Sequence, residues 1–507
     1  MSSYEKTQRD QRFKQIAENT PNLPLVSDDA NFTLGFYKTY NHCAPNLTEA
    51  DLAKSVNILK DFCHDDFPMK KHPIYDAVAM GEIGNNVLGS LYSSIAKQAL
   101  KSYHMYRNKH SEYVFTLLND QIKLRQSWQK QMDTSLNNEL ITDPQIWLAS
   151  PQYITPDGLL NSVKNINLEA VLIQSSQTLA WIRNRLDLPT NDLTATDNSP
   201  EMLRQITLAQ SLLAPLCELM AYDGLAMALN SAAFQARLQN SGNAKYIDQA
   251  RERLKDIRDP EQVIQKVSDS TDFFVGSGCH DLSFNYDAER HGILFGEGLC
   301  EPDCLNGKTV GVRWRRKGTG QLAWKMYQNE INGDNEATGD DIGITYIMDN
   351  DDDMTKVFEQ YIERSLSGSS DKFSLNINRK DKIKVASSSP SFIDMFRPII
   401  ERQNVQDQSV IKQVNKAFRD VKIRTIDGDN VPFEAQLATN QDRKDNRIGP
   451  AAHIFYKQGH NPHPEDLNNV EWIWRRREHI GSKQLISASV NAAQLLIGYI
   501  RKTNLTF

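Results

Sequence analysis

The residues of this chain most suited to chemistry lie in one stretch, residues 431–457, VPFEAQLATNQDRKDNRIGPAAHIFYK. Its first seven residues alternate as in a strand, which places Glu434 and Gln436 on the same strand face. His453 and Lys457 follow, four residues apart. A carboxylate can bind a divalent ion, whereas a cationic side chain can bind an anion. The simpler alternative is that His453 caps a core helix and Lys457 is solvated.

A basic segment, TVGVRWRRKGTGQLAWKM (residues 309–326), is predicted to be a strand followed by a helix. Four cations come where the strand ends: Arg313, Arg315, Arg316 and Lys317. Gly318 and Gly320 loosen the turn, and Lys325 lies on the helix. Guanidinium and ammonium groups at a helix start suit a polyphosphate, although a solvated basic face would look the same. The segment is no P-loop, because GxxxxGK[ST] is absent.

Acidic residues open the next predicted strand, DDIGITYIMD, which begins with Asp340 and Asp341. The acidic run at residues 349–353 is predicted to be a solvated turn. Asp340 and Glu434 together could hold Mg²⁺ through oxygen ligands, beside cations that neutralise a triphosphate. These are the components of phosphoryl-type transfer, in which positioning and charge neutralisation supply most of the rate.

The composition of the whole chain favours a soluble globular protein of two to four domains, because it has 507 residues, 39% hydrophobic and 24% charged. The formal net charge of −6 gives no general argument for nucleic-acid or membrane binding. The polar N-terminus lacks an apolar signal core, and no apolar run reaches the roughly 18 residues of a membrane helix. We expect a cytoplasmic protein without a membrane partner, although an exported effector without a classical signal would look the same.

Cysteine and histidine residues gather between residues 279 and 304: Cys279, His280, His291, Cys300 and Cys304. Their spacing contains no CxxC pair, so ordinary thiols are the simpler interpretation and a zinc site stays an alternative.

The predicted elements change in character along the chain. Residues 46–255 show apolar residues at helical spacing, with few alternating runs. After about residue 270, five short runs read as strands: TVGVRWRR, DIGITYIMD, FSLNINRK, DVKIRTID and VPFEAQLA. MTKVFEQYIERSL and SVIKQVNKAFRD are predicted helices between them, and the serine run 387–389 is a predicted loop. The expected fold is α + β and multidomain, an all-α half followed by a mixed sheet with helices.

Three stretches of the second half resemble motifs of the RelA/SpoT family, the alarmone synthetases and hydrolases. FEAQLAT…RIGPAAHIFYK is similar to a strand E-x-Q-[IL]-R-T followed by G-x-A-A-H-W-x-Y-K, RRKGTGQLAWKM to R-x-K-x-x-x-S-x-x-x-K, and DDIGIT to D-x-x-G-I-R. Their order along the chain agrees. The resemblance implies a synthetase domain of the RelA/SpoT nucleotidyltransferase-like fold at residues 256–465.

The helical half resembles the hydrolase (HD) region of the same family. KKHPIYDAVAMGEI, AVLIQSSQTLAWIRNRL and LAPLCELMAYDGLAMALNSAAF carry this likeness. The resemblance implies an HD-hydrolase-like domain at residues 46–255, after an N-terminal extension at 1–45 and before a C-terminal helical tail at 466–507.

The activity that the resemblance implies is transfer of pyrophosphate from ATP to the ribose 3′-hydroxyl of GDP or GTP. Arg315 and Lys317 would bind the ATP phosphates, with Lys325 nearby. Asp340 and Glu434 would hold Mg²⁺ and be the catalytic pair, with Glu434 taking the hydroxyl proton. The acceptor side would be bound by Gln436, His453 and Lys457.

The chain departs from the family pattern in both halves. The metal-binding Asp, His and Asn of the hydrolase helix fall on Gln177, Ala180 and Trp181, so hydrolase activity is predicted absent. The family Ser and two Arg of the synthetase fall on Gln321, Thr345 and Ala438. No guanine-binding P-K-x-N-G-Y-x-S-[IL]-H loop is found near KDKIKVASSSPSFIDMF, where Phe392 could stack on a base.

These departures leave three interpretations of function open. The chain could be a pyrophosphokinase with a changed acceptor, a catalytically inactive relative that binds nucleotides or regulates, or an alarmone synthetase whose guanine loop lies elsewhere. All three predict nucleotide partners. An RNA or protein partner and a homo-oligomer stay open.

Overall fold

The computed structural model describes residues 49–63, 110–135, 156–186, 200–276, 280–284, 293–333, 340–367, 373–375, 382–414, 419–449 and 464–477. The chain forms two compact units. The first comprises Met1–Gln129, Asn165–Ala180 and Ile480–Phe507, and the second Lys130–Lys164 and Trp181–His479. The predicted domain limits at residues 45, 255 and 465 stay predictions.

The first unit contains helix α3 (Glu49–Cys63), most of α6 (His110–Ser135) and most of α10 (Leu168–Leu186). Buried polar groups join α6 to the start of α10. Arg125 Nε donates to Gln174 Oε1 at 2.6 Å, and the Asn167 side-chain amide donates to Asp120 Oδ2 at 2.7 Å. Such charge-assisted bonds hold the two helices in one register.

Helix α10 carries the positions at which the family resemblance expects hydrolase metal ligands. Gln177, Ala180 and Trp181 are all buried there, with 2%, 0% and 4% of their surfaces exposed. The Arg185 guanidinium lies over the Trp181 ring, 3.8 Å from its centroid. These side chains therefore serve helix packing, and the prediction that hydrolase activity is absent stays a prediction.

The helices of the second unit precede its sheet in the sequence. They are α9 (Pro156–Val163), α12 (Pro200–Leu208), the π-helix η1 (Ala209–Leu213), α13 (Ala214–Leu219), α14 (Asp223–Asn240), α15 (Lys245–Arg253) and α16 (Pro260–Val275). Short 3₁₀ turns, η2 (Lys255–Ile257), η3 (Asp303–Leu305) and η4 (Gln406–Gln408), lie further along the chain. Every element described before residue 280 is helical, as the helical spacing of apolar residues predicts.

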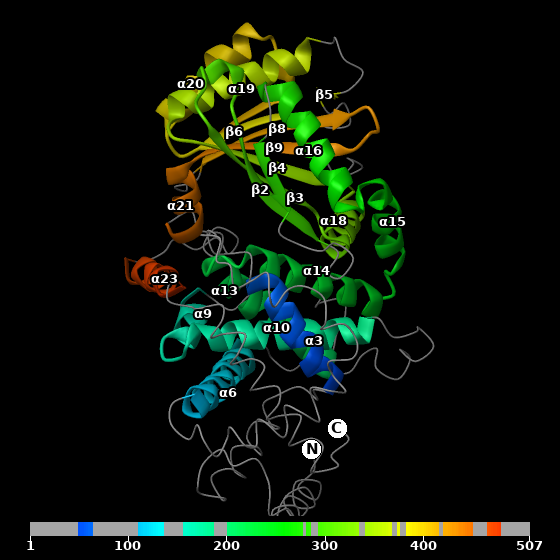
Figure 1. The fold of residues 1–507 in the computed structure, drawn as a ribbon, viewed down its shortest axis with the longest axis vertical. Coiled ribbons are helices and arrows are strands. Elements are labelled where there is room, and N and C mark those ends of the chain that lie inside the picture. Colours follow the sequence, from blue (N-terminus) through cyan, green and yellow to red (C-terminus); the bar gives the residue numbers. More distant parts are fainter. Residues whose placement is uncertain are drawn as a thin grey trace, which may run out of the picture. The chain divides into compact units, whose positions relative to one another are not determined.

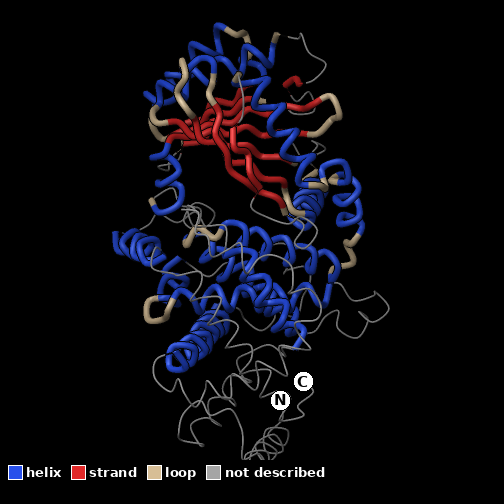
Figure 2. The backbone as a smooth tube through the Cα atoms, viewed as in Figure 1, coloured by secondary structure: helices blue, strands red, loops and turns tan. Residues whose placement is uncertain are grey.

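A single mixed sheet of nine described strands follows, in the order β1-β2-β3-β4-β9-β8-β6-β7, with β5 also on β8 (Figure 2). The strands are β1 (His280–Phe284), β2 (Leu294–Cys300), β3 (Val310–Arg316), β4 (Ile342–Met348), β5 (Phe373–Leu375), β6 (Ile383–Ser387), β7 (Ser409–Gln413), β8 (Arg419–Asp427) and β9 (Pro432–Thr439). The pairs β4–β9 and β6–β7 are parallel, whereas all other pairs are antiparallel. The predicted α + β class with a mixed sheet is confirmed.

The helices between and after the strands are α18 (Thr319–Ile331), α19 (Asp351–Leu366), α20 (Pro390–Arg402), α21 (Asn440–Ile448) and α23 (Pro464–Arg477). Helices α16, α19 and α20 lie along one face of the sheet (Figure 1). Their core includes the stacked rings of Phe274 and Tyr361, whose centroids lie 4.0 Å apart. Tyr346 of β4 and Phe433 of β9 face this core. The other sheet face is therefore left for polar side chains.

Two of the predicted elements are wrong. SVIKQVNKAFRD was expected to be a helix, but its ends form β7 and the start of β8, because β7 pairs with the edge of β6 from Ile383↔Ser409 onward. Residues 351–353 form the first turn of α19 and no solvated turn. Asp353 is buried and pairs with Lys308 Nζ at 2.9 Å. The helix dipole favours acidic residues at this position.

The predicted zinc alternative falls partly outside the described residues, which exclude Cys279 and His291. Cys300 is buried in β2, and burial raises the pKa of Cys304 to about 11. A protonated thiol is a poor zinc ligand. Cys300 and Cys304 thus agree with ordinary thiols, whereas the zinc site stays untested.

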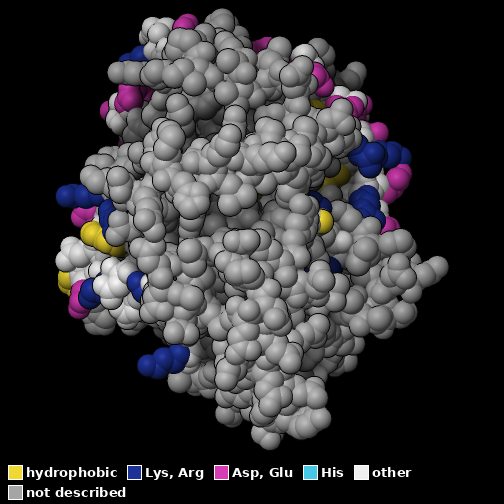
Figure 3. Space-filling view, turned by 60° about the horizontal axis from the view of Figure 1, so that its bottom comes forward, with side chains coloured by type: hydrophobic (Ala, Val, Ile, Leu, Met, Phe, Trp, Pro, Cys, Tyr) yellow, Lys and Arg dark blue, Asp and Glu magenta, His cyan; other side chains and the backbone are white. Residues whose placement is uncertain are grey.

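The described part of the surface mixes both signs of charge. Lysine and arginine side chains lie beside acidic ones on the face that Figure 3 shows. Among the helices that the structure describes, none combines the length and the apolar character needed to cross a membrane.

The approach of α18 to α14 generates the first prediction. A Cβ added to Gly320 would lie 1.9 Å from the Ser231 carbonyl oxygen, whereas one added to Gly311 would make only ordinary contacts from 3.5 Å. We expect Gly320→Ala to lower the free energy of unfolding by about 1–3 kcal/mol through overpacking, measured by denaturant titration. Gly311→Ala is the control. Equal stability of both variants would contradict this packing.

Candidate functional site

The polar face of the sheet carries rows of side chains that cross four strands. The parallel register of β4 and β9 sets these rows, because Gly343 lies opposite Glu434 and Thr345 opposite Gln436. Antiparallel pairing on either side extends them. One row reads Arg315, Gly343, Glu434 and Arg424; the next reads Arg313, Thr345, Gln436 and Lys422. Residues far apart in the chain thus meet on one surface.

Asp340 precedes β4 and is held by two ammonium groups. Lys325 Nζ, from α18, lies 2.5 Å from Asp340 Oδ1, and Lys317 Nζ pairs with Asp340 Oδ2. Burial alone would raise the pKa of Asp340, but the two lysines hold it well below its ordinary value. Asp340 is therefore a permanent anion at neutral pH.

For Lys317, in contrast to Asp340, the effect of burial on the pKa outweighs the attraction of the paired charge. Burial lowers its pKa to about 8, and the charges of Lys325 and Arg315 add to this effect against the attraction of Asp340. Its backbone N–H donates to the Asp341 carbonyl at 2.9 Å, which continues the β3–β4 ladder by one residue. Lys317 therefore loses its proton more readily than an exposed lysine does.

Glu434 is held by two cations of β8. Lys422 Nζ lies 3.1 Å from Glu434 Oε1, and Arg424 Nε lies 3.2 Å from Oε2. Burial and the Asp340 charge raise the pKa of Glu434, but Lys422 and Arg424 bring it below its ordinary value. Glu434 is thus charged and fixed in position, and it is a weaker base than a free glutamate.

Asp340 and Glu434 are close enough for one charge to affect the other, because the Asp340 carboxylate raises the pKa of Glu434. Two carboxylates in this position match the oxygen ligands of Mg²⁺. Nowhere in the described ranges do three or more His, Cys, Asp or Glu side chains form a complete metal centre. Further Mg²⁺ ligands would therefore have to be water or substrate phosphates, as is usual for this ion.

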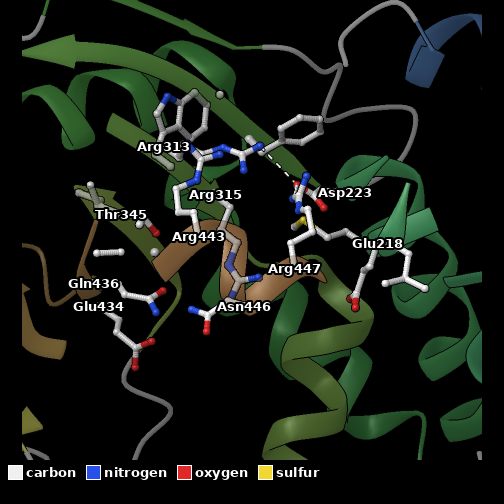
Figure 4. Close-up of a pocket in the computed structure, with 18 of the residues that line it drawn as sticks. Glu218, Asp223, Arg313, Arg315, Thr345, Glu434, Gln436, Arg443, Asn446 and Arg447 are labelled. Atoms are coloured by element: carbon white, nitrogen blue, oxygen red, sulfur yellow. Dashed lines mark hydrogen bonds and ion pairs between the residues drawn. The ribbon is translucent and has the colours of Figure 1, made fainter. Parts of the chain in front are cut away.

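A cavity of about 380 Å³ adjoins Glu434. Its walls are the polar sheet face, α13, the start of α14 and α21. Glu434 and Gln436 lie on one side of a group of arginines, and Asp223 and Glu218 lie on the other (Figure 4). The cavity is therefore lined by charged groups of both signs.

The arginines at the α21 side of the cavity are Arg313, Arg443 and Arg447. Arg313 bonds Glu297 at 2.8 Å and Asp223 at 3.3 Å, and Arg447 also pairs with Asp223. Burial would raise the pKa of Asp223, but the two arginines lower it below its ordinary value. Asp223 is thus a charged counter-ion that two guanidinium groups share.

The predicted site residues fall into three groups. Asp340 pairs with Lys317 and Lys325, and its charge affects Glu434, whereas Glu434, Arg315 and Gln436 line the cavity. Asp341 and Arg316 do not join them, because Asp341 pairs with Arg253 at 2.5 Å and Arg316 Nη1 donates to the Ile257 carbonyl. His453 and Lys457 lie outside the described residues.

Phe392 is not placed to stack on a base. It is 4% exposed and packs on Phe396, with the Arg419 guanidinium 3.8 Å above its ring. The expectation that its ring could receive a base is therefore wrong for this conformation.

Several residues of the site were missed from the sequence. Lys422 and Arg424 sit at alternate positions of DVKIRTID, a signal for one polar strand face, but their link to Glu434 depends on strand order. Arg443 and Arg447 are four apart on α21 and thus share a helix face. Asp223 comes from the helical half, and no sequence pattern connects it to the sheet.

The comparisons with known proteins add no relative. No model of a known protein family matches the chain, and no curated protein matches it.

The shifted pKa of Lys317 generates a prediction about pH. Lys317 is cationic below about pH 8 and neutral above it, so its attraction for a phosphate should fade as pH rises through this value. We expect the dissociation constant for ATP to increase between pH 7 and 9.5. Lys317→Arg should flatten this dependence, because arginine stays charged. Isothermal titration calorimetry measures both, and equal slopes would contradict the assignment.

Proposed function

We propose that the chain is a pyrophosphokinase-like transferase that moves pyrophosphate from ATP to a ribose 3′-hydroxyl of GDP, GTP or a changed acceptor. The observation that carries this proposal is that Asp340 and Glu434, 94 positions apart in the sequence numbering, lie near enough for the Asp340 charge to raise the Glu434 pKa. Lys317 and Lys325 pair with Asp340, and Arg315 lines the cavity beside Glu434. Arg315, Glu434 and Gln436, which belong to the stretches that resemble the family motifs, lie on one sheet face and line one cavity.

The donor would be bound by the cations of the β3–α18 step. Arg315 is exposed and lines the cavity, Lys317 directly follows the same strand, and Lys325 lies on α18. Three positive charges there would offset the charge of a triphosphate. Asp340 orients both ammonium groups while the donor is absent.

The proposed step balances as follows. The acceptor 3′-oxygen bonds to the β-phosphorus of ATP, the bond from that phosphorus to the α–β bridging oxygen breaks, and AMP leaves. The hydroxyl proton passes to Glu434, and the acceptor gains a 3′-diphosphate. Because Lys422 and Arg424 lower the Glu434 pKa, proton transfer would come late, as the oxygen becomes acidic.

Asp340 and Glu434 would also hold Mg²⁺, which would neutralise phosphate charge when bound. The lysines on Asp340 would then turn from the carboxylate to the phosphates. Gln436, one row along from Glu434, would position the acceptor, together with His453 and Lys457.

A second candidate function has an observation in its favour. Both carboxylates are already matched by internal cations, two on Asp340 and two on Glu434. Such self-neutralised clusters can be purely structural. A catalytically inactive protein that binds nucleotides as a regulatory or interaction platform would keep this cluster without turnover.

A transfer assay separates these functions. We expect label from β,γ-labelled ATP to appear on GDP, GTP or another nucleotide in the presence of Mg²⁺. Glu434→Gln should reduce this rate by about 100-fold or more, the scale of a general base. Glu401→Gln, an exposed acid on α20, is the matched control and should be neutral.

Two results of the assay would contradict the transferase. No labelled acceptor, together with a rise in Tm on adding ATP, would replace the transferase by the nucleotide-binding platform. No labelled acceptor and no change in Tm would remove both functions.

A further inference from the structure

The α21 side of the cavity contains a cation, Arg443, with which no side chain of the described residues pairs. Within the described part of the chain, Arg443 has no hydrogen bond and no ion pair, although it is only partly exposed and lines the cavity. Its neighbours Arg313 and Arg447 are cationic too, and they share Asp223. A half-buried guanidinium without a partner is costly, so its persistence needs a reason.

The charges around Arg443 also favour binding of an anion. Burial and the charges of Arg313 and Arg447 together lower the pKa of Arg443 to about 10, although Glu297 and Asp223 act in the opposite direction. Three guanidinium groups therefore repel one another around one open volume. An anion placed among them would relieve this repulsion and supply the missing bonds.

We propose that Arg443, Arg313 and Arg447 form an anion subsite for the phosphate groups of a second ligand, with Asp223 as the counter-ion that the phosphate displaces. Guanidinium groups match phosphate oxygens in a fork geometry, which favours phosphate over a simple halide. Asn446, on the same helix and lining the same cavity, adds an amide donor.

The subsite and the donor cations differ in the elements that carry most of their residues. Arg315, Lys317 and Lys325 belong to the β3–α18 step, whereas Arg443 and Arg447 lie on α21. Arg313 lies on β3, two residues before Arg315 (Figure 4). Arg315, Glu434 and Gln436 line the same cavity as Arg443 and Arg447. The assignment of the anion to the acceptor rests on the proposed function. The proposal of an anion subsite does not depend on that function.

Calorimetry with inorganic pyrophosphate on the full chain tests the subsite. Arg443→Gln should weaken pyrophosphate binding roughly 10- to 100-fold, the value of one charge-assisted hydrogen bond to a phosphate. Lys444→Gln, which removes the neighbouring exposed charge, should change it less than about twofold. Arg315→Gln separates the two positions, because Arg443→Gln should still weaken binding in that background.

Stability gives an independent readout. Because Arg443 has repulsive neighbours and no ion-pair partner among the described residues, Arg443→Gln should leave Tm unchanged or raise it without phosphate. The variant should also lose the rise in Tm that pyrophosphate causes. If Arg443 instead stabilised the fold, Arg443→Gln would lower Tm in the absence of phosphate. Misfolding of Arg443→Gln, a lower Tm, or undiminished pyrophosphate binding would each overturn the subsite.

The same variants distinguish the subsite from the transferase. Loss of pyrophosphate binding in Arg443→Gln without any transfer in the wild type would keep the subsite and reject the transferase. Transfer with unchanged pyrophosphate binding and unchanged acceptor KM in Arg443→Gln would keep the transferase and reject the subsite. If the transferase and the subsite proposals are both correct, Arg443→Gln should raise the KM for the acceptor at least about tenfold and leave the KM for ATP constant.

Discussion

The parallel pairing of β4 with β9 is the constraint on which the site depends. Strand side chains alternate between faces, so one register choice decides which residues are neighbours. With Gly343 opposite Glu434, the apolar residues of both strands face α16, α19 and α20. The polar residues then face the cavity. A shift of the β9 register by one residue would bury Glu434 in the core and expose Phe433 and Ala435. The same register therefore forms both the core and the site.

Charge compensation differs between the two ends of this surface. Around Asp340 and Glu434, each carboxylate is bonded to two cations, which offsets the cost of removing it from water. At α21, Arg313 and Arg447 share Asp223, Arg313 also pairs with Glu297, and Arg443 pairs with no described acid. The first arrangement is stable without a ligand. The second is strained electrostatically and gains from an anion.

The limits of sequence prediction follow from this geometry. Alternation predicted β3, β4, β8 and β9 nearly to their ends, because these strands have one apolar and one polar face. β7 was taken for a helix, since Val410 and Ile411 with Val414 also fit helical spacing, and only the open edge of β6 selects the strand. β1, β2 and β6 were not predicted as strands.

The sequence by itself determined which residue types could do chemistry: Asp340, Glu434 and the cations of the β3–α18 step stand at positions that alternation and local charge density reveal. It also determined the division into a helical part and a mixed part, because the helical spacing and the strand alternation of apolar residues are both local properties of the sequence. Only the tertiary structure decided which cations neutralise Glu434, and that Asp223 and α21 close the cavity. Strand order and helix packing are set by contacts between distant segments, and no local pattern encodes them.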